Sequence, residues 1–397
     1  SAWSTRNGRR IVKIAIIGAG PAGLYFARLM KRHQPAHQIE VIEQNPFGAT
    51  YGFGVTLGGP ARERMKATDP EVADALAALM HFNNKQRICL DGEDVLVEYA
   101  SYGGAIERLK LLGVLQKACL DLGIALHHQR RVDDLSAFAA YDLIVGADGP
   151  NSVVRGTDPA AFGTHSYSLT NPFAWYGVAK AMKPNALVFR HTKDGVFVGH
   201  YYAYKSDMST FVAECDAKTW TQSGFDRLSD PERKSAIEAI FADHLQGEPL
   251  VENKSIWRTF KVVVNERWFS GNRVLIGDAL RSAHFSIGSG TRLAMEDALA
   301  LFEAFSEHGE DLAKVLPRYV EIRKPIRDLF GVATERSFNW YENVRQAMAG
   351  GDVWDFTHDF LTRTGRVDDK RLKDYAPSFY ADYMRRKNVD ARSAAVQ

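Results

Sequence analysis

The chain has 397 residues, enough for two or three domain-sized units that share a large core. Its formal net charge of +2 gives no reason to expect nucleic acid or an anionic membrane as the main partner, and no apolar run approaches the roughly 18–20 residues that span a bilayer. The three cysteines are too widely spaced for a disulfide framework or a metal-binding knuckle, so we expect a protein of the reducing cytoplasm.

The first expected unit combines a strand, a glycine-rich turn, a helix and a second strand. Residues 11–17 are mostly apolar and predict a buried parallel strand. The turn at 18–23 follows, then a helix over 24–30 and a second strand over 39–43. This order is typical of a dinucleotide-binding βαβ unit.

Each special residue of this unit has a physical reason. Gly18 makes the tight turn, Gly20 lets a pyrophosphate approach the backbone, and Gly23 packs the helix on the strand. The helix N-terminus favours the phosphate charge, and Glu43 can accept hydrogen bonds from a ribose. The alternative is a coincidental glycine-rich turn, but strand, helix and acid stand in register. The expected cofactor-binding residues here are Gly18, Gly20, Pro21, Ala22, Gly23, Glu43 and Gln44.

Three local patterns follow. The loop over 45–55 holds three glycines and either brings backbone close to a flat ligand at Gly54 or forms a surface turn. Apolar residues at helical spacing predict a helix over 69–80. Alternation around Asp-Gly predicts a hairpin over 86–99.

A second polar strand end comes after the next helix. The helix expected over 106–119 carries Arg108 in its first turn, where the helix dipole prefers an acid. The cation at that position is therefore expected to serve an anion. A further buried parallel strand over 141–149 ends in Asp148 and Gly149, which returns the chain to the first sheet.

From about residue 165 the pattern changes to short strands without helices between them, which predicts an antiparallel sheet. A helix is expected over 231–245, a strand of the first sheet over 273–278, and helices to about residue 348, with a frayed tail beyond 385. The fold class is α/β: a Rossmann-like domain with a parallel sheet (9–164 and 269–310), an interleaved antiparallel-sheet substrate domain (165–268) and a C-terminal helical region (311–397).

Three strand-end motifs now converge: the turn 18–23, Asp148-Gly149 and Gly277-Asp278. Over about residues 11–345 the chain resembles the single-component FAD-dependent aromatic hydroxylases typified by para-hydroxybenzoate hydroxylase. The resemblance implies that Asp278 binds the flavin ribityl chain, that Asp148 and Gly149 serve flavin and nicotinamide cofactor, and that Arg108 reaches the FAD phosphates or ribose. It also implies O2 as co-substrate and NADH or NADPH as a transient reductant.

The segment 284–291 distinguishes branches of that family. Arg281 and Phe285 stand where the usual family pattern has His and Pro. This version is similar to salicylyl-CoA and 2-aminobenzoyl-CoA hydroxylases and to violacein-pathway hydroxylases of tryptophan-derived indoles. We expect hydroxylation of an electron-rich ring through a flavin hydroperoxide, with an aryl-CoA thioester as substrate. The alternatives are a tryptophan- or indole-derived ring, or a flavin-linked reductase or dehydrogenase that inserts no oxygen.

The expected chemistry assigns roles to the remaining residues. The amides of a helix N-terminus stabilise the negative edge of a reduced flavin, and an aromatic-lined sheet keeps the site dry. His284 is either a general base for a phenol or indole, or a packed core histidine. No metal site is expected, and the sequence leaves open whether the protein is a monomer or a dimer. The expected residues are Gly277, Gly288, Gly290 and Thr291 for the flavin, and Tyr202, Tyr204 and Phe285 for the substrate.

Overall fold

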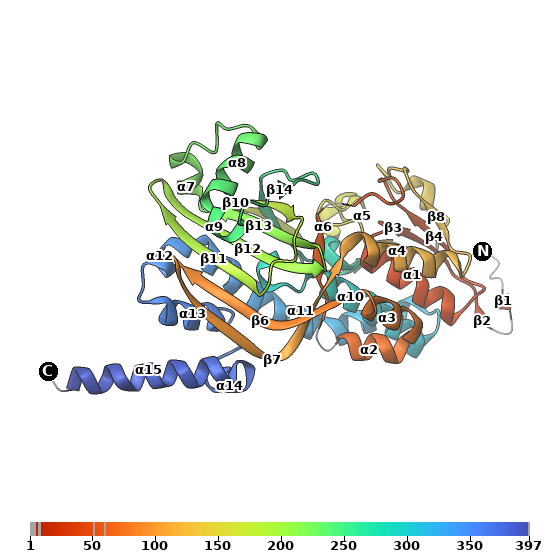
Figure 1. The fold of residues 1–397 in the computed structure, drawn as a ribbon. Helices are drawn as coiled ribbons and strands as arrows, with labels where there is room; N and C mark the ends of the chain where they lie inside the picture. The colour runs from red at the N-terminus through yellow and green to blue at the C-terminus, as the bar shows by residue number, and fades with distance from the viewer. Residues whose placement is uncertain (1–4, 7–8, 51, 59–60, 396–397) are drawn as a thin grey trace.

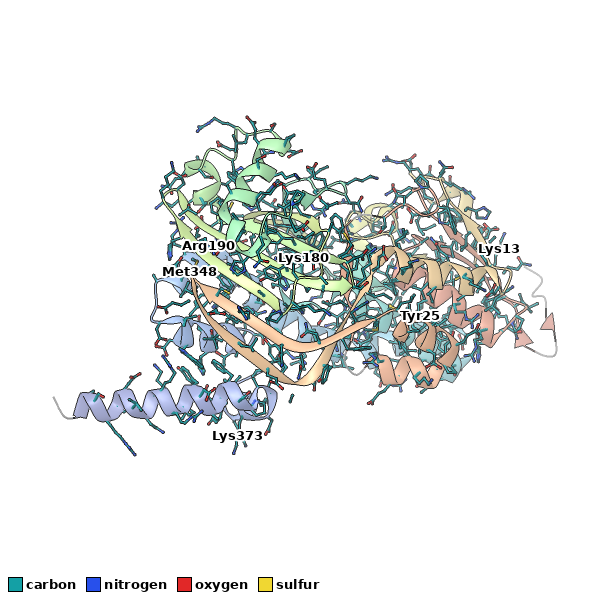
Figure 2. All side chains as sticks on the ribbon, viewed as in Figure 1. Lys13, Tyr25, Lys180, Arg190, Met348 and Lys373 are labelled. Atoms are coloured by element: carbon teal, nitrogen blue, oxygen red, sulfur yellow. The ribbon has the colours of Figure 1, made fainter. Side chains whose placement is uncertain are left out.

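The fold is described from a computed structural model, which describes residues 5–6, 9–50, 52–58 and 61–395. Tyr51, within the expected glycine-rich loop, lies outside these residues. The two large sheets lie side by side, each covered by helices, and α15 extends from the end of the molecule opposite to β1 and β2 (Figure 1). Side chains fill each half, with Tyr25 in the half of the smaller sheet and Arg190 and Met348 at the far end of the other (Figure 2).

The smaller sheet is the expected Rossmann-like unit, and its strands are parallel except for one edge pair. In spatial order its strands are β16 (Phe269–Ser270), β17 (Arg273–Leu275), β9 (Leu143–Gly146), β3 (Lys13–Ile17), β4 (Gln38–Ile42) and β8 (Ala125–His127). Its helices are α1 (Pro21–His33), α2 (Ala61–Thr68), α3 (Pro70–Ala77), α4 (Arg108–Leu120), α5 (Val153–Gly156), α6 (Pro159–Phe162) and α10 (Gly290–His308). The central strands are apolar and almost wholly buried, as continuous parallel strands covered on both faces must be.

The larger sheet has nine strands. Along the main path they are β14 (Leu250–Val251), β10 (Thr164–Val178), β13 (Met208–Cys215), β12 (Gly195–Lys205), β11 (Asn185–Thr192), β6 (His81–Leu90), β7 (Glu93–Glu107) and β5 (Gly54–Thr56), with β15 (Arg258–Asn265) on β10. All pairs are antiparallel except β11 with β6. One face packs on α8 (Asp230–Ile240) and α9 (Ala242–Leu245). The opposite face packs on α11 (Leu312–Glu342), α12 (Val344–Met348) and α13 (Val353–Thr362).

Short elements complete the chain: β1 (Thr5–Arg6), β2 (Arg9–Arg10), α7 (Ala217–Gln222), α14 (Asp369–Tyr375), α15 (Pro377–Ala395) and 3-10 turns at Ser136–Phe138, Gly277–Ala279 and Phe285–Ile287. No helix of the described residues combines the length and the apolar character needed to cross a membrane.

The structure differs from the sequence expectations in the bounds of several elements. The 86–99 hairpin is longer than expected, consists of β6 and β7, and joins the larger sheet through β11. The sequence did not predict this pairing, because β11 is remote from the hairpin in the chain. The 106–119 helix begins at Arg108, since Ile106 still pairs with β5. The 231–245 helix breaks at Phe241. The domain boundaries remain a prediction, and the larger sheet takes three strands from before residue 165.

The expected frayed tail beyond 385 was wrong. Helix α15 continues to Ala395 and extends away from the body in Figure 1. Its first half is anchored by buried Phe379, which stacks on Trp354, and by an ion pair between Lys387 and Asp355. Tertiary contacts of this kind start a helix, and residues without strong breakers let it continue.

Candidate active site

The glycine-rich turn has the shape that a pyrophosphate needs. Gly18 has φ +105°, and a Cβ there would lie 2.2 Å from the Ala147 carbonyl oxygen. A Cβ at Gly23 would lie 2.2 Å from the Gly18 oxygen, so both glycines are required by close packing. A Cβ at Gly20 would meet nothing within 4 Å. The open side of the turn is therefore at Gly20, where α1 begins with Pro21 and leaves its N-terminus free for an anion.

Glu43 lies beside this turn, directly after β4. Its Oε2 accepts a hydrogen bond of 3.0 Å from the Ala19 amide, and its Oε1 accepts one of 2.8 Å from the Asn45 amide. These bonds fix the carboxylate at the end of the strand, next to the nucleotide turn. Gln44 is exposed beside it, and Ala22 is buried in the first turn of α1.

Asp148 follows β9 at the same edge of the sheet. Its Oδ2 accepts a hydrogen bond of 2.7 Å from the Val153 amide, while its Oδ1 is buried without a partner. Burial raises the pKa of Asp148, and the hydrogen bonds it accepts oppose this shift. Gly149 has φ +77°. A buried acceptor without a donor is costly unless a ligand hydroxyl or amide completes it.

Asp278 follows β17, and its charge interacts with that of Arg108. Its side chain is reached by water, yet the protein around it raises its pKa by desolvation, while Arg327 and Arg108 lower it. Arg108 Nε donates a hydrogen bond of 3.0 Å to Thr50 Oγ1. A carboxylate and a guanidinium thus lie near enough for their charges to interact, and the Asp278 side chain is open to a ligand. They can hold hydroxyl and phosphate groups respectively.

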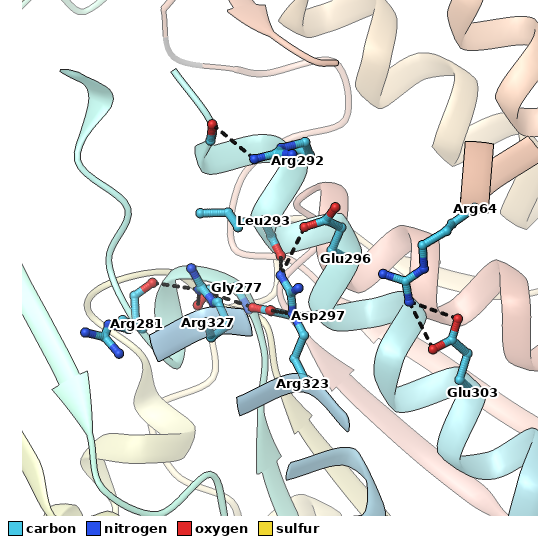
Figure 3. A network of polar contacts seen from close by, with 11 residues as sticks. Arg64, Gly277, Arg281, Arg292, Leu293, Glu296, Asp297, Glu303, Arg323 and Arg327 are labelled. Carbon is cyan, nitrogen blue, oxygen red and sulfur yellow. Dashed lines mark hydrogen bonds and ion pairs between the residues drawn. The ribbon is translucent and has the colours of Figure 1, made fainter. Parts of the chain in front are cut away.

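A buried ion network holds the turn that carries Asp278 (Figure 3). Asp297 is fully buried and accepts hydrogen bonds from Arg323 Nε at 2.7 Å and from the Gly277 amide at 2.9 Å. Arg327 lies 3.2 Å from Asp297 and donates to the carbonyl oxygens of Gly277 and Arg281. Gly277 has φ +63°. The network therefore fixes the turn that carries Asp278, at a position where the left-handed backbone favours glycine.

The N-terminus of α10 closes the next side of the site. Ser289 makes no side-chain cap, so the first amides, at Gly290 and Thr291, have no capping partner from it. Gly288 has φ +59°, and its carbonyl oxygen accepts a short hydrogen bond from Thr56. These uncapped amides suit the negatively charged edge of a reduced flavin. The uncapped amides of α10, the open Gly20 turn and the unpartnered Oδ1 of Asp148 together fit FAD.

A cavity of about 550 Å³ lies between the larger sheet, at strands β6, β7, β11 and β12, and the 285–289 turn. Tyr202 and Phe285 line it, as do five cationic side chains, Lys85, Lys183, Arg292, Arg363 and Arg366. No Asp or Glu is among the described residues of its wall. A site of this size with aromatic walls suits a small ring, and its charge suits an anionic substrate.

Tyr204 and Gly54 pack against each other. As alternation predicts, Tyr202 and Tyr204 lie on one face of β12, while Tyr201 packs on the other. A Cβ at Gly54 would lie 2.3 Å from the Tyr204 ring, so only glycine leaves room for that ring at this position. Tyr202 Oη donates to the Gly54 carbonyl oxygen at 2.8 Å. The roles of Gly54 in cofactor binding and of Tyr204 in substrate binding remain predictions.

His284 lies behind the cavity wall. It is 2% exposed and stacks on Phe285 with ring centroids 4.2 Å apart. Its Nδ1 accepts a hydrogen bond of 3.2 Å from the Ser286 amide and lies 2.8 Å from Ser286 Oγ. Burial, and then the charge of Arg363, lowers the pKa of His284 to about 3. Catalysis by His284 remains a prediction, but these contacts are those of a residue that shapes the turn.

The sequence did not single out several residues that the fold brings to the cavity. Arg363 holds the turn by donating to the Ser286 carbonyl oxygen at 2.8 Å and to Ser337 Oγ at 3.0 Å. His200, whose pKa burial lowers to about 4, and Tyr341 also line the wall. His200 could have been found from its alternation with Tyr202. Arg363 lies more than 70 residues after the 285–289 turn, so no local sequence pattern predicts that the two are in contact. No cluster of His, Cys, Asp or Glu in the described part of the chain could hold a metal ion.

The parallel sheet, the open Gly20 turn and the uncapped N-terminus of α10 are the features expected of a flavoprotein. The family described as FAD binding domain matches residues 129–329. The chain is 34% identical to salicyloyl-CoA 5-hydroxylase of Streptomyces sp over 89% of this chain and 70% of the relative. It is 36% identical to 3-hydroxy-4-methyl-anthranilyl-[aryl-carrier protein] 5-monooxygenase of Streptosporangium sibiricum, over 91% and 97%. It is 33% identical to protodeoxyviolaceinate monooxygenase of Chromobacterium violaceum, over 85% and 91%.

Among solved structures, 2-methyl-3-hydroxypyridine-5-carboxylic acid oxygenase has a TM-score of 0.68 at 17% identity, over 89% of this chain and 96% of that one, which shows the shared fold. The chain belongs to the FAD-binding aromatic monooxygenases. Its cofactor is FAD, its reductant a reduced nicotinamide nucleotide, and the resemblance inferred from the sequence motifs is confirmed.

Proposed function

We propose that this monooxygenase hydroxylates the ring of an aryl-CoA thioester of the salicylyl or 2-aminobenzoyl type. The observation that carries the proposal is the cavity wall, which has five cations and no carboxylate among its described residues. An aryl-CoA ester is an aromatic ring joined to a strongly anionic carrier, so its two ends match the aromatic and the cationic parts of the wall. Two relatives named for aryl thioesters support the same class.

FAD, held by the open Gly20 turn, Asp148 and Asp278, would supply the redox chemistry: with electrons from the reduced nicotinamide nucleotide, one atom of O2 would enter the ring and the other would leave as water. The chain's own residues position and shield this reaction. The α10 N-terminus stabilises negative charge beside Gly290, and Phe285 and Tyr202 form walls around the ring. Water must be kept out, and the large buried aromatic face of the sheet serves that purpose.

His200 and Tyr341 are polar side chains of the described wall, and both stay neutral at physiological pH. Burial lowers the pKa of His200 to about 4, and burial raises the pKa of Tyr341 above its ordinary value. We assign them hydrogen-bonding roles that orient the ring substituent, a task that neutral donors and acceptors perform. Arg363 adds a fixed positive charge between them and the 285–289 turn.

The second candidate is a tryptophan- or indole-derived ring, favoured by the likeness to protodeoxyviolaceinate monooxygenase. The two candidates are separated by incubating the FAD-loaded protein with salicylyl-CoA, 2-aminobenzoyl-CoA, tryptophan and simple phenols. NADH and NADPH oxidation, oxygen uptake and hydroxylated product are measured together. We expect stoichiometric product only with a CoA ester. Stoichiometric product from tryptophan or a phenol, with none from the esters, would refute the proposal.

A further inference from the structure

A second cavity of about 510 Å³ adjoins the substrate cavity. The two share the residues Ile287, Ser289, Leu361, Arg363, Arg366 and Tyr375. One extended ligand can therefore occupy both, with its reactive end beside the 285–289 turn and its other end outside. The volume is in the range of sites that hold a small-molecule ligand.

The floor of this second cavity is apolar and accessible. It is formed by one side of α11, where Leu329 is 59% exposed and Val332 is 52% exposed. Large aliphatic side chains exposed next to each other, one helical turn apart, leave apolar surface in water. A flat base or an amide-bearing aliphatic arm would cover this surface.

Three arginines from separate elements stand around this floor: Arg336 on α11, Arg366 in the turn after α13, and Arg371 on α14. Arg366 lies over the Phe330 ring at 4.1 Å, and Arg371 Nη1 donates to the Arg366 carbonyl oxygen at 2.9 Å. We call the cavity formed by these three arginines over Leu329 and Val332 the arginine groove.

The turn at Gly365 packs directly against the side chain of Arg336. Gly365 has φ +71°, and a Cβ there would lie 1.8 Å from Arg336 Nη1. The guanidinium of Arg336 thus lies directly against the backbone, in a place that any side chain at 365 would occupy. The turn and α11 are packed to present Arg336 toward the groove.

These guanidinium groups lack anionic partners. In the described part of the chain no carboxylate lies within ion-pair distance of Arg336, Arg366 or Arg371, and neither Asp nor Glu lines the groove. By contrast Arg318, at the surface of the same α11, pairs with both Glu307 and Glu321. Three unpaired guanidinium groups around one apolar floor are the donors that phosphate groups prefer.

We propose that the arginine groove binds the phosphorylated adenosine end of coenzyme A, while the thioester and ring occupy the substrate cavity. This inference rests on the proposed function. Coenzyme A carries a diphosphate and a 3′-phosphate on its adenosine end, an adenine that can lie on the apolar floor, and a narrow pantetheine arm. That arm passes between the shared residues Ile287, Ser289 and Arg363. Specificity for the carrier thus comes from a site separate from the one that holds the ring.

The test compares a full and a truncated substrate on the FAD-loaded enzyme. The variants are Arg336→Ala, Arg371→Ala and the double variant, and the substrates are salicylyl-CoA and salicylyl-N-acetylcysteamine, which lacks every phosphate. Lys373→Ala is the matched control, because it removes an exposed charge from the same α14 (Figure 2) without lining the groove. Melting temperature and FAD content are measured for each variant.

For each arginine removed, KM for salicylyl-CoA should rise about tenfold, the usual loss for one phosphate contact. The KM values for NADH and NADPH should stay constant, and the preference for the CoA ester over the truncated ester should shrink. Lys373→Ala should behave as the unaltered enzyme. Direct titration with CoA itself, followed by calorimetry, should show the same loss of affinity and needs no turnover.

Three results would overturn the inference. Equal kcat/KM for both esters in the unaltered enzyme would refute the groove while leaving the aryl-thioester function intact. A rise in KM for NADH or NADPH instead of the ester would assign the groove to the reductant. Hydroxylation of a carrier-protein thioester but not of the CoA ester would replace the nucleotide by a protein partner. If neither ester is hydroxylated at all, the proposed function itself fails, which is a separate result.

Discussion

Replacing Asp297 by alanine should destabilise the fold and loosen the turn that carries Asp278. The carboxylate of Asp297 is fully buried and accepts from Arg323 at 2.7 Å and from the Gly277 amide at 2.9 Å, with Arg327 at 3.2 Å. Removing one partner of a buried ion pair costs about 3–5 kcal/mol, because the other charge is left unpaired. Glu296, 3.3 Å from Arg323, offsets part of that loss, so we expect about 3 kcal/mol.

The measurement is the free energy of unfolding from urea titration of the FAD-free protein, followed by the dissociation constant for FAD. Glu303→Ala is the matched control: it lies on the same α10 and pairs with Arg64, but both side chains are 38% exposed (Figure 3). An exposed pair of this kind contributes about 0–1 kcal/mol. Asp297→Asn keeps an acceptor for the Gly277 amide and should fall between the two. If Asp297→Ala costs no more than Glu303→Ala, the reasoning about the buried network is wrong.

Three further outcomes are expected. Gly20→Val should fold with a near-normal melting temperature but retain no FAD, since a Cβ there meets no protein atom within 4 Å; normal FAD content by absorbance would show that the fingerprint has been misread. His284→Gln should keep its product per NAD(P)H and show an unchanged pH profile around pH 6–7, because a histidine whose pKa is lowered to about 3 is already neutral there; peroxide release with FAD still bound would instead give His284 a part in the chemistry. Glu214→Gln should remove a pH dependence of stability. Burial, and then Glu342, raise the pKa of Glu214 to about 8 against a hydrogen bond from Asn171, so the folded state retains a proton that the unfolded chain loses near 4.5. Stability of the unaltered protein should fall as pH rises from about 4.5 to about 8, by a few kcal/mol at most, and denaturant titrations should show a flatter curve for the variant. An identical slope in both proteins would contradict this.

The sequence by itself determined the cofactor-binding half of the protein. The glycines of the 18–23 turn, Glu43, Asp148 and Asp278 each stand at the end of an apolar parallel strand, and such ends meet at one edge of a sheet. Period-two alternation likewise places Tyr202 and Tyr204 on one face of β12, as the structure shows. These inferences succeeded because the signal is local: a strand, its turn and its helix lie within about 30 residues.

Only the tertiary structure decided how the cavity beside the 285–289 turn is closed. The hairpin of β6 and β7 joins β11 across about 100 residues of sequence, and nothing in its alternation says which sheet it enters. The residues that give the cavity its charge also come from separate segments of the chain. Arg363 reaches back to Ser286, and Arg336, Arg366 and Arg371 meet around one groove although each alone reads as an ordinary surface cation. A charge acquires a role from the groups it faces, and those groups are set by packing between remote segments, which no local pattern encodes.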